Sequence, residues 1–343
     1  MSSQKHFSML NEPERIELKK GSVKQVGGKL HDLDMPPIEK YKTMDGHEFN
    51  VIRDDLPFPF PSPNFSKIRG IAAHFEKLHE AGVRKVASQD TIIARVGWGV
   101  GYFADKYDME HWGFYPRGHD DFYRKMMQSF GSTAVPMMGT HQRIVTGMAK
   151  KWLERNNLDD VHYLPVGLRL DESKHEHVKL VECLKDELDC GGTLVMVISS
   201  GTILSGLIGG IMEHDIDINV KGVLVHNFKG RKDKILREAR ALTSVARSPL
   251  FGTTHKFTFE VFDDGYDYNQ KAHYKPPFPC DRFLDGKAFS WMMDNIEDLP
   301  QPIYFWNVGG EWSPEVGVND DLLGDGQTSQ EDIVSYLKSR GVI

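Results

Sequence analysis

A short Ser/Gly/Thr turn directly after an apolar run has the residues that a phosphate site requires. The run Thr193–Ile198 (TLVMVI) is typical of a strand buried on both faces, and Ser199, Ser200, Gly201 and Thr202 follow it at the start of an expected helix. Backbone N–H groups at a helix N-terminus bind phosphate, and the hydroxyls of such a turn can donate as well. The same residues also fit a plain N-cap, so this pattern alone leaves both interpretations open. The absence of a following GK[ST] excludes a P-loop.

A lysine, Lys67, stands at the start of a second expected helix, Ile68–Ala81. A lysine acts as a nucleophile or a base when its amine is neutral near pH 7, which partial burial and the field of a cofactor can achieve. Taken alone, Lys67 fits a solvated side chain at a helix start better than a catalytic one. Its assignment therefore depends on the segments around it.

Several segments resemble, in the same order along the chain, the motifs of fold-type II pyridoxal-phosphate (PLP) enzymes of the tryptophan synthase β superfamily. They are most similar to those of the 1-aminocyclopropane-1-carboxylate (ACC) deaminase and D-cysteine desulfhydrase family. Val51–Leu56 followed by Asn64–Gly70 looks like that family's "KRDDL…GNKxRxL" stretch. The other segments with this resemblance are Tyr163–Gly167, Ser199–Thr202, Phe262–Tyr266, Asp281–Ala288 and Asn307–Gly310. Their common order is far more specific than any one of them.

The resemblance implies a two-domain α/β enzyme in which each domain is a mostly parallel sheet flanked by helices. Residues 1–67 and 166–343 would form the large PLP-binding domain, with residues 68–165 as a small inserted domain. Lys67 would form the internal aldimine with PLP, and the turn 199–202 would hold the phosphate of the cofactor. The resemblance also implies a homodimer.

The segment expected to hold the carboxylate of the substrate departs from the family pattern. Family members carry a Ser-x-Asn-His-like turn, whereas Ala87–Gly99 contains no Asn-His. Ser88, Gln89 and Thr91 could supply hydroxyl or amide contacts, and Arg95 could bind a carboxylate or a phosphate through two nitrogens. Alternatively, Arg95 pairs with a nearby acid and Gln89 caps a helix. In either case the acid end of the substrate is not held in the usual way of the family.

A second departure concerns the groups expected near the ring of the cofactor. The tyrosine expected by the resemblance is replaced by Leu284, and the next residue, Asp285, would meet the pyridine nitrogen. A carboxylate there keeps the pyridine protonated and strengthens its capacity to accept electrons. Asp285 also fits a turn before Gly286. Tyr266, or Tyr268, could replace the lost phenol as a catalytic group, and spacing does not choose between them.

These features predict chemistry at the α-carbon of a small amino-acid-like substrate, by deamination, elimination or decarboxylation. The two departures also allow a larger substrate, such as an aminoacyl group attached to a hypermodified DNA base, as used in viral DNA modification. A third hypothesis is a PLP-binding scaffold that has lost turnover.

Other polar clusters carry weaker signals. Four histidines have no companions at the spacing of metal ligands, so we expect no metal site: His111, His119, His175 and His177. A basic cluster favours a solvated face over a contact with an anionic ligand or nucleic acid: Lys229, Arg231, Lys232 and Lys234.

Alternation of strands and helices positions these residues and predicts parallel sheets. The expected strands are Phe49–Arg53, Val83–Ala87, Trp112–Tyr115, Thr133–Val135, Thr193–Ile198 and Val220–Val225. The expected helices are Ile68–Ala81, Gly97–Tyr107, Asp121–Phe130, His175–Leu188, Ser200–Met212, Lys232–Val245 and Glu331–Lys338. Residues 1–45 are expected to wrap the surface.

Composition places these elements in a globular protein. A chain of 343 residues suits two domains, and 40% hydrophobic with 27% charged residues is ordinary. No run reaches about 18 apolar residues, so no membrane span is expected. The lack of a signal-like start and the presence of only three cysteines predict a cytoplasmic location. A net charge of −7 argues against a broad nucleic-acid-binding face but permits a local basic groove.

Overall fold

The structure, a computed structural model, describes residues 14–16, 35–58, 61–119, 121–139, 141–227, 230–243, 256–310 and 330–342. These residues divide into two compact units. The described residues of 14–57 and 174–310 belong to the first unit, and those of 58–173 and 330–342 belong to the second. This division groups Lys67 with the second unit, whereas the limits drawn from the sequence place it in the larger domain. Those domain limits stay a prediction.

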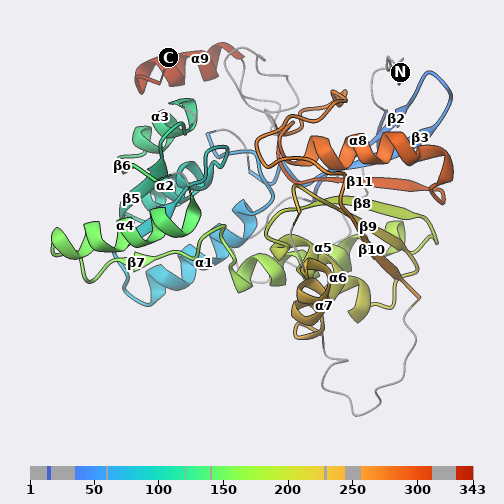
Figure 1. Cartoon of the computed structure of the whole chain (residues 1–343), viewed down its shortest axis with the longest axis horizontal. Helices are drawn as coiled ribbons and strands as arrows, with labels where there is room; N and C mark the ends of the chain where they lie inside the picture. The colour runs from blue at the N-terminus through green and yellow to red at the C-terminus, as the bar shows by residue number, and fades with distance from the viewer. Residues whose placement is uncertain are drawn as a thin grey trace. The chain divides into compact units, whose positions relative to one another are not determined.

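A seven-stranded sheet forms the centre of the first unit (Figure 1). Its strands are β1 (Glu14–Ile16), β2 (Ile38–Lys42), β3 (Glu48–Arg53), β8 (Thr193–Ile198), β9 (Asn219–Leu224), β10 (Thr258–Phe262) and β11 (Ile303–Asn307). They lie in the order β1-β2-β3-β11-β8-β9-β10, and the pairs from β3 to β10 are parallel. The carboxyl ends of five neighbouring strands therefore share one edge of this sheet.

Helices cover both faces of this sheet, because alternate residues of β8 belong to two different cores. Leu194 and Met196 pack with α5 (Asp171–Leu188), α6 (Thr202–Glu213) and α7 (Arg231–Arg240), whereas Val195 and Val197 pack with α8 (Asp285–Asn295). A short 3₁₀ turn, η2 (Ile296–Asp298), follows α8. The apolar run of β8 thus has the burial expected of a strand covered on both sides.

The second unit has its own four-stranded parallel sheet. Its strand order is β6 (Thr133–Met137), β5 (Glu110–Pro116), β4 (Lys85–Gln89) and β7 (His162–Tyr163). Its helices are α1 (Ile68–Glu80), α2 (Val96–Lys106), α3 (Asp121–Ser129), α4 (Gln142–Arg155) and α9 (Gln330–Ser339). Near the C-terminus, the backbone oxygen of Val342 accepts a hydrogen bond from Lys125 of α3. The predicted α/β class with mostly parallel sheets is confirmed.

One sequence-based expectation on elements was wrong, and some elements were not expected. Residues 38–42 do not wrap the surface: they form β2, between β1 and β3, and Ile38 and Tyr41 are buried. Pro37 directly precedes this strand, a position where proline is tolerated. Its carbonyl accepts the N–H of Arg53 at 2.9 Å. Helix α4 was not expected at all. The last residues of the helix expected over 232–245 lie outside the described residues.

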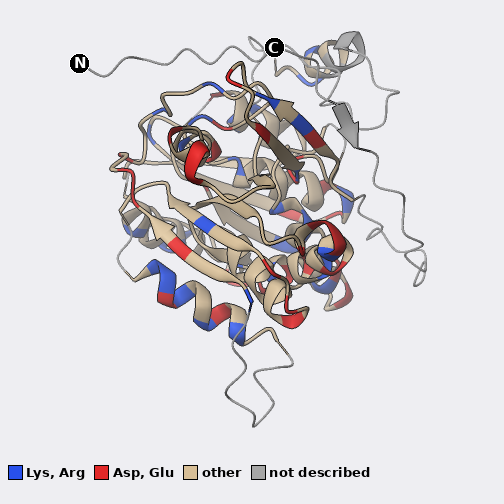
Figure 2. Cartoon of the chain, turned by 90° about the vertical axis from the view of Figure 1, so that its right-hand side faces the viewer, with Lys and Arg blue, Asp and Glu red and all other residues tan. Residues whose placement is uncertain are grey.

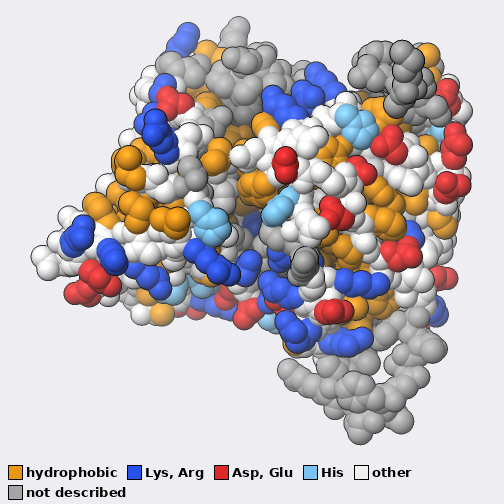
Figure 3. Space-filling view, in the orientation of Figure 1, with side chains coloured by type: hydrophobic (Ala, Val, Ile, Leu, Met, Phe, Trp, Pro, Cys, Tyr) orange, Lys and Arg blue, Asp and Glu red, His pale blue; other side chains and the backbone are white. Residues whose placement is uncertain are grey.

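In the view of Figure 2, Lys and Arg residues are interspersed with Asp and Glu residues along the chain. Large hydrophobic side chains that are clearly exposed among the described residues are Met44, Met138 and Ile144. Two of these three lie at the start of α4, in a region where Figure 3 shows hydrophobic and basic side chains next to one another. None of the described helices has the length and apolar character needed to cross a membrane.

Candidate active site

Lys67 is the N-cap residue of α1, and its amine reaches a turn far along the chain. Its Nζ donates a hydrogen bond to the carbonyl oxygen of Gly167 at 2.6 Å, across 100 residues of sequence. Burial, together with the positive charge of Arg169, lowers the pKa of Lys67 to about 8. The predicted segments Asn64–Gly70 and Tyr163–Gly167 are therefore adjacent in the second unit. A lysine with this pKa has a useful neutral fraction near pH 7 to 8, as a nucleophile requires.

Tight backbone geometry fixes both partners of this hydrogen bond. The turn is closed by the N–H of Leu168 donating to the carbonyl of Pro165 at 2.9 Å, and Gly167 has φ +74°, which glycine adopts without strain. A Cβ on Gly70 would lie 1.8 Å from Oγ of Ser173, so α1 packs directly against the start of α5. Lys67 thus lies at the start of a helix that packs closely against Ser173 through Gly70.

The turn 199–202 has the form of a phosphate cradle at the N-terminus of α6. Gly201 has φ +82°, and a Cβ there would lie 2.9 Å from the side chain of Ile235. The hydroxyls of Ser200 and Thr202 are 3.0 Å apart, and the carbonyl of Gly201 accepts the N–H of Ser205 at 2.9 Å. Amides at the positive end of a helix and two hydroxyls form a donor set that suits a phosphate group.

Arg231 adds a positive charge to this cradle. It is the first residue of α7, and its guanidinium donates to the carbonyl of Ser200 at 2.8 Å. The sequence pattern favoured a solvated face for this residue, whereas Arg231 is only partly exposed and bonds to the turn. The two residues are 31 positions apart. Only the packing of α7 beside α6 brings them together. Lys234 pairs with Glu238, and Lys229 lies outside the described residues.

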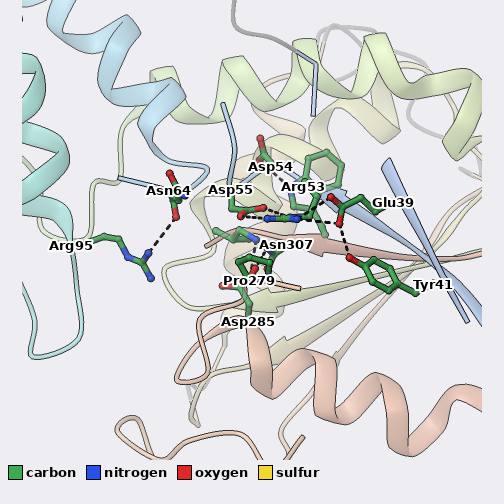
Figure 4. Close-up of polar contacts among 12 residues, drawn as sticks. Glu39, Tyr41, Arg53, Asp54, Asp55, Asn64, Arg95, Pro279, Asp285 and Asn307 are labelled. Atoms are coloured by element: carbon green, nitrogen blue, oxygen red, sulfur yellow. Dashed lines mark hydrogen bonds and ion pairs between the residues drawn. The ribbon is translucent and has the colours of Figure 1, made fainter. Parts of the chain in front are cut away.

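Asp285 is the first residue of α8 and is 1% exposed. Its Oδ1 accepts the N–H of Val308 at 2.8 Å, and the N–H of Asp281 donates to the carbonyl of Gly309 at 2.8 Å. These contacts join the predicted segments Asp281–Ala288 and Asn307–Gly310, as the labelled Asp285 and Asn307 in Figure 4 illustrate. The N-terminus of a helix stabilises a negative charge on such a carboxylate.

Asp285 and the cradle lie at the same edge of the first unit's sheet. Val308 directly follows β11, and Ser199 directly follows β8, the neighbouring parallel strand. Binding sites of parallel α/β sheets form at this edge. One unit therefore presents phosphate donors and a carboxylate that could meet a pyridine nitrogen on adjacent strands.

The phenol of Tyr266 is part of a polar chain on the same unit. Its Oη lies 2.5 Å from Nδ1 of His273, whose Nε2 lies 3.0 Å from the carboxylate of Asp294. Burial raises the pKa of Tyr266. Tyr268 instead packs edge-on against His226, two residues past the end of β9, with ring centroids 6.1 Å apart. The catalytic role expected for Tyr266 stays a prediction.

Lys287 is a fully buried lysine, and its contacts differ from those of the partly buried Lys67. Its Nζ donates to the carbonyl oxygens of Val225, Asp267 and Tyr268, at 2.7 to 3.1 Å. Burial lowers the pKa of Lys287 to about 8. Three acceptors satisfy all three protons of an ammonium group. We therefore assign Lys287 a structural role, which joins the segment after β10 to the end of β9.

The side chains of Ser88 and Gln89, predicted to bind substrate, are buried at the end of β4. The hydroxyl of Ser88 lies 2.8 Å from Nε2 of His111, and burial lowers the pKa of His111 to about 3. The amide of Gln89 donates to the carbonyl of Gln142 at 3.0 Å and accepts a hydrogen bond from Thr146 at 2.7 Å. Both side chains have partners inside the second unit, and their role toward substrate stays a prediction.

Arg95 and Thr91 lie in the segment that leads into α2. A guanidinium nitrogen of Arg95 is 3.4 Å from the carbonyl of Asn64, three residues before Lys67, as the dashed line in Figure 4 shows. The guanidinium also lies over the ring of Tyr123, 5.3 Å from its centroid. The carbonyl of Thr91 accepts the N–H of Ala94. The segments that contain Arg95 and Lys67, two predicted site residues, are therefore in contact.

A buried ionic cluster lies where β3 ends (Figure 4). Arg53 donates two hydrogen bonds of 2.9 Å to Asp55 and contacts Glu39 at 3.0 Å, and the hydroxyl of Tyr41 donates to Glu39 at 2.7 Å. Arg53 and Asp55 are completely buried. This part of the "KRDDL"-like motif is thus structural.

Asp54, between these residues in sequence, points to a different set of partners. One of its oxygens lies 3.0 Å from Nε2 of His177 and accepts a hydrogen bond from the indole of Trp306 at 3.0 Å. His177 is fully buried, so it is a core histidine. Among the described residues, no group of three or more His, Cys, Asp or Glu side chains could hold a metal ion.

The predicted site residues thus divide between the two units. Ser199, Ser200, Gly201, Thr202, Asp285 and Tyr266 belong to the first unit, and Lys67, Ser88, Gln89, Thr91 and Arg95 belong to the second. Within each unit, contacts join motifs that are far apart in sequence.

Comparison with known proteins identifies the family. No family model matches the chain. The chain is 33% identical over 284 residues to the glycyl-dTMP PLP-dependent decarboxylase of Pseudomonas phage M6, an alignment that covers 80% of this chain and 98% of the phage protein. The chain belongs to the family of this phage enzyme. It is a PLP-dependent enzyme.

Solved structures agree on a fold-type II architecture. An ACC deaminase homologue matches with a TM-score of 0.63 at 17% identity, over 77% of this chain and 85% of that one. A fungal L-serine ammonia-lyase from Rhizomucor miehei matches with a TM-score of 0.54 at 17% identity, over 78% of this chain and 89% of that one. A hydrogen sulfide-producing enzyme from Fusobacterium nucleatum matches with a TM-score of 0.57 at 14% identity, over 83% of this chain and 98% of that one. The predicted fold-type II recognition is confirmed.

The pKa of Lys67 predicts how cofactor-free protein takes up PLP. The reaction needs the neutral amine, so the rate of uptake should rise with pH and level off above about pH 8, well below the value expected for an exposed lysine. Stopped-flow absorbance measurements between about pH 6 and 11 would test this. A rate that continues to rise up to about pH 10 would show that burial does not lower the pKa of this amine.

Proposed function

We propose that this enzyme is a decarboxylase that removes CO2 from a glycyl group carried by a thymine nucleotide. The observation that carries the proposal is the 33% identity, over 98% of its length, to a phage enzyme named as a glycyl-dTMP PLP-dependent decarboxylase. The missing Asn-His turn supports it, since a substrate larger than a free amino acid needs a different binding segment. The expected homodimer and cytoplasmic location stay predictions.

The residues of the first unit fit the two ends of PLP. The amides and hydroxyls of the turn 199–202 would hold its phosphate, with the charge of Arg231 beside them. Asp285 would accept a hydrogen bond from its pyridine nitrogen. When bound, PLP supplies an electron sink for the electron pair left on the α-carbon when a bond to it breaks. A carboxylate at the pyridine strengthens that sink, which suits decarboxylation.

Lys67 would bind the cofactor covalently between turnovers and then serve as the proton donor. Loss of CO2 leaves the α-carbon with an electron pair that must take up a proton. An ammonium group with a pKa of about 8 can donate that proton and regain it near neutral pH. The hydrogen bond to Gly167 would position the amine for this step.

The second unit would bind the nucleotide part of the substrate. Arg95, with its planar guanidinium, would bind the phosphate of the nucleotide, and Ser88, Gln89 and Thr91 would line the same segment. In this assignment Arg95 does not clamp the carboxylate, which must leave as CO2. Tyr266 would be a further acid–base group.

Release of CO2 from glycyl-dTMP is the expected result of incubating it with the PLP-loaded enzyme. Mass spectrometry would show a nucleotide that has lost CO2 and kept its nitrogen, and ammonia would be absent. Lys67→Ala serves as the inactive control. Release of ammonia without CO2 would instead make the enzyme a deaminase. If neither CO2 nor ammonia were released, the proposed activity would be refuted.

A further inference from the structure

Helix α4 exposes a row of positive charges that have no acidic partners among the described residues. Arg143, Lys150, Lys151 and Arg155 are exposed, and within the part of the chain that the structure describes none of them forms an ion pair. Glu154 is the only acidic residue of this helix. Because an α-helix repeats every 3.6 residues, positions 143, 147, 150, 151 and 154 share one face. This face therefore carries a net positive charge on a protein whose net charge is −7.

Two exposed hydrophobic side chains lie at the start of the same helix. Met138 is 78% exposed and Ile144 is 56% exposed, on either side of the N-cap residue His141. A single exposed hydrophobic residue is common, but two of the three large ones among the described residues lie here, beside the row of cations. Figure 3 shows this combination of hydrophobic and basic side chains over α4.

We propose that this surface, formed by the loop residues Met138, Gly139 and His141 and the exposed face of α4, docks duplex DNA. The inference rests on the proposed function for the glycyl-bearing base, which would then be part of a DNA chain. Charge complementarity identifies the occupant, because exposed Lys and Arg side chains along a helix match the phosphates of a duplex.

The hydrophobic pair gives this surface a second function. A base whose substituent must reach a buried cofactor has to leave the stack, and apolar side chains such as Met and Ile fill or open base steps in proteins that distort DNA. Met138 and Ile144 would occupy the position of the displaced base. Arg143, Lys150 and Lys151 would hold the flanking phosphates.

Helix α7 offers a matched comparison. It also exposes two arginines, Arg237 and Arg240, for which no ion pair is found among the described residues. However, two of the lysines near it share Glu238, and its exposed face lacks large hydrophobic residues. Replacing two cations there changes the net charge as much as replacing two on α4.

Binding of unmodified duplex DNA by the PLP-loaded enzyme, measured by fluorescence anisotropy at several salt concentrations, tests the proposal. The double variant Lys150→Ala/Lys151→Ala should bind about tenfold more weakly, with a salt slope smaller by about 2, whereas Arg237→Ala/Arg240→Ala should bind as the wild type does. Release of CO2 from free glycyl-dTMP should be the same in all three proteins. Absence of binding by the wild type, or equal losses in both double variants, would overturn the proposal.

The binding experiment needs no turnover, so it separates the two proposals. DNA binding through α4 without decarboxylation of the glycyl-bearing base, either in free glycyl-dTMP or within a duplex, would leave the docking surface standing and refute the proposed function. Decarboxylation of free glycyl-dTMP without DNA binding would support the proposed function and refute the docking surface.

The hydrophobic pair is tested by Met138→Ser/Ile144→Ser. This variant should keep most of its affinity for duplex DNA but lose the fluorescence increase of a 2-aminopurine next to the modified base. A change of oligomeric state in this variant, seen by light scattering, would instead make the surface a contact between copies of this chain and would overturn the proposal.

Discussion

Lys67→Ala is expected to abolish the visible absorbance of bound PLP and to lower the rate of CO2 release from glycyl-dTMP by at least about 10³-fold. Alanine cannot form the covalent bond to the cofactor, and it cannot donate a proton to the α-carbon. Absorbance of the purified protein and single-turnover assays with added PLP would measure both effects.

Lys77→Ala is the matched control for this variant. Lys77 lies on the same helix, its side chain is 67% exposed, and it pairs with Glu172 at the surface. Its replacement should leave the absorbance and the rate unchanged. A yellow, active Lys67→Ala protein would show that another lysine carries the cofactor.

The second large effect concerns stability. Arg53→Met should lower the free energy of unfolding by about 3 to 5 kcal/mol, because two buried carboxylates, Asp55 and Glu39, would lose the positive charge between them. Burial already raises the pKa of Asp55, so the cluster depends on Arg53 to keep this carboxylate ionised. Urea unfolding followed by circular dichroism would measure the loss.

Lys42→Met is the control for the stability measurement. Lys42 also bonds a carboxylate, Glu48, but its side chain is 54% exposed, so the loss should be much smaller than that of Arg53→Met. Equal losses in the two variants would show that burial of the Arg53 cluster does not determine its contribution to the free energy of unfolding.

Local sequence patterns predicted the elements that carry the cofactor site. The apolar run Thr193–Ile198 gave β8 with its exact bounds, and α1 begins at the predicted Ile68. Continuous apolar runs and strongly periodic helices are encoded within a few residues, so they can be read without tertiary information. Motif order then placed Lys67 and the turn 199–202 at the starts of helices, where the structure has them.

Contacts between distant segments could not be predicted in the same way. Arg231 lies beside Ser200 because α7 packs on α6, and Ser88 lies beside His111 because β4 pairs with β5. Neither contact can be inferred from the spacing of residues along the sequence. Helix α4 was missed because exposed Ile144 adds an apolar residue outside its buried stripe of Val145, Ala149 and Leu153.

The central claim is that PLP is attached to Lys67. Reduction of the loaded enzyme with borohydride makes the bond between a lysine and PLP permanent, and peptide mapping by mass spectrometry then locates it. The account predicts PLP on the peptide that contains Lys67. PLP on the peptide that contains Lys287, or on no lysine at all, would contradict it.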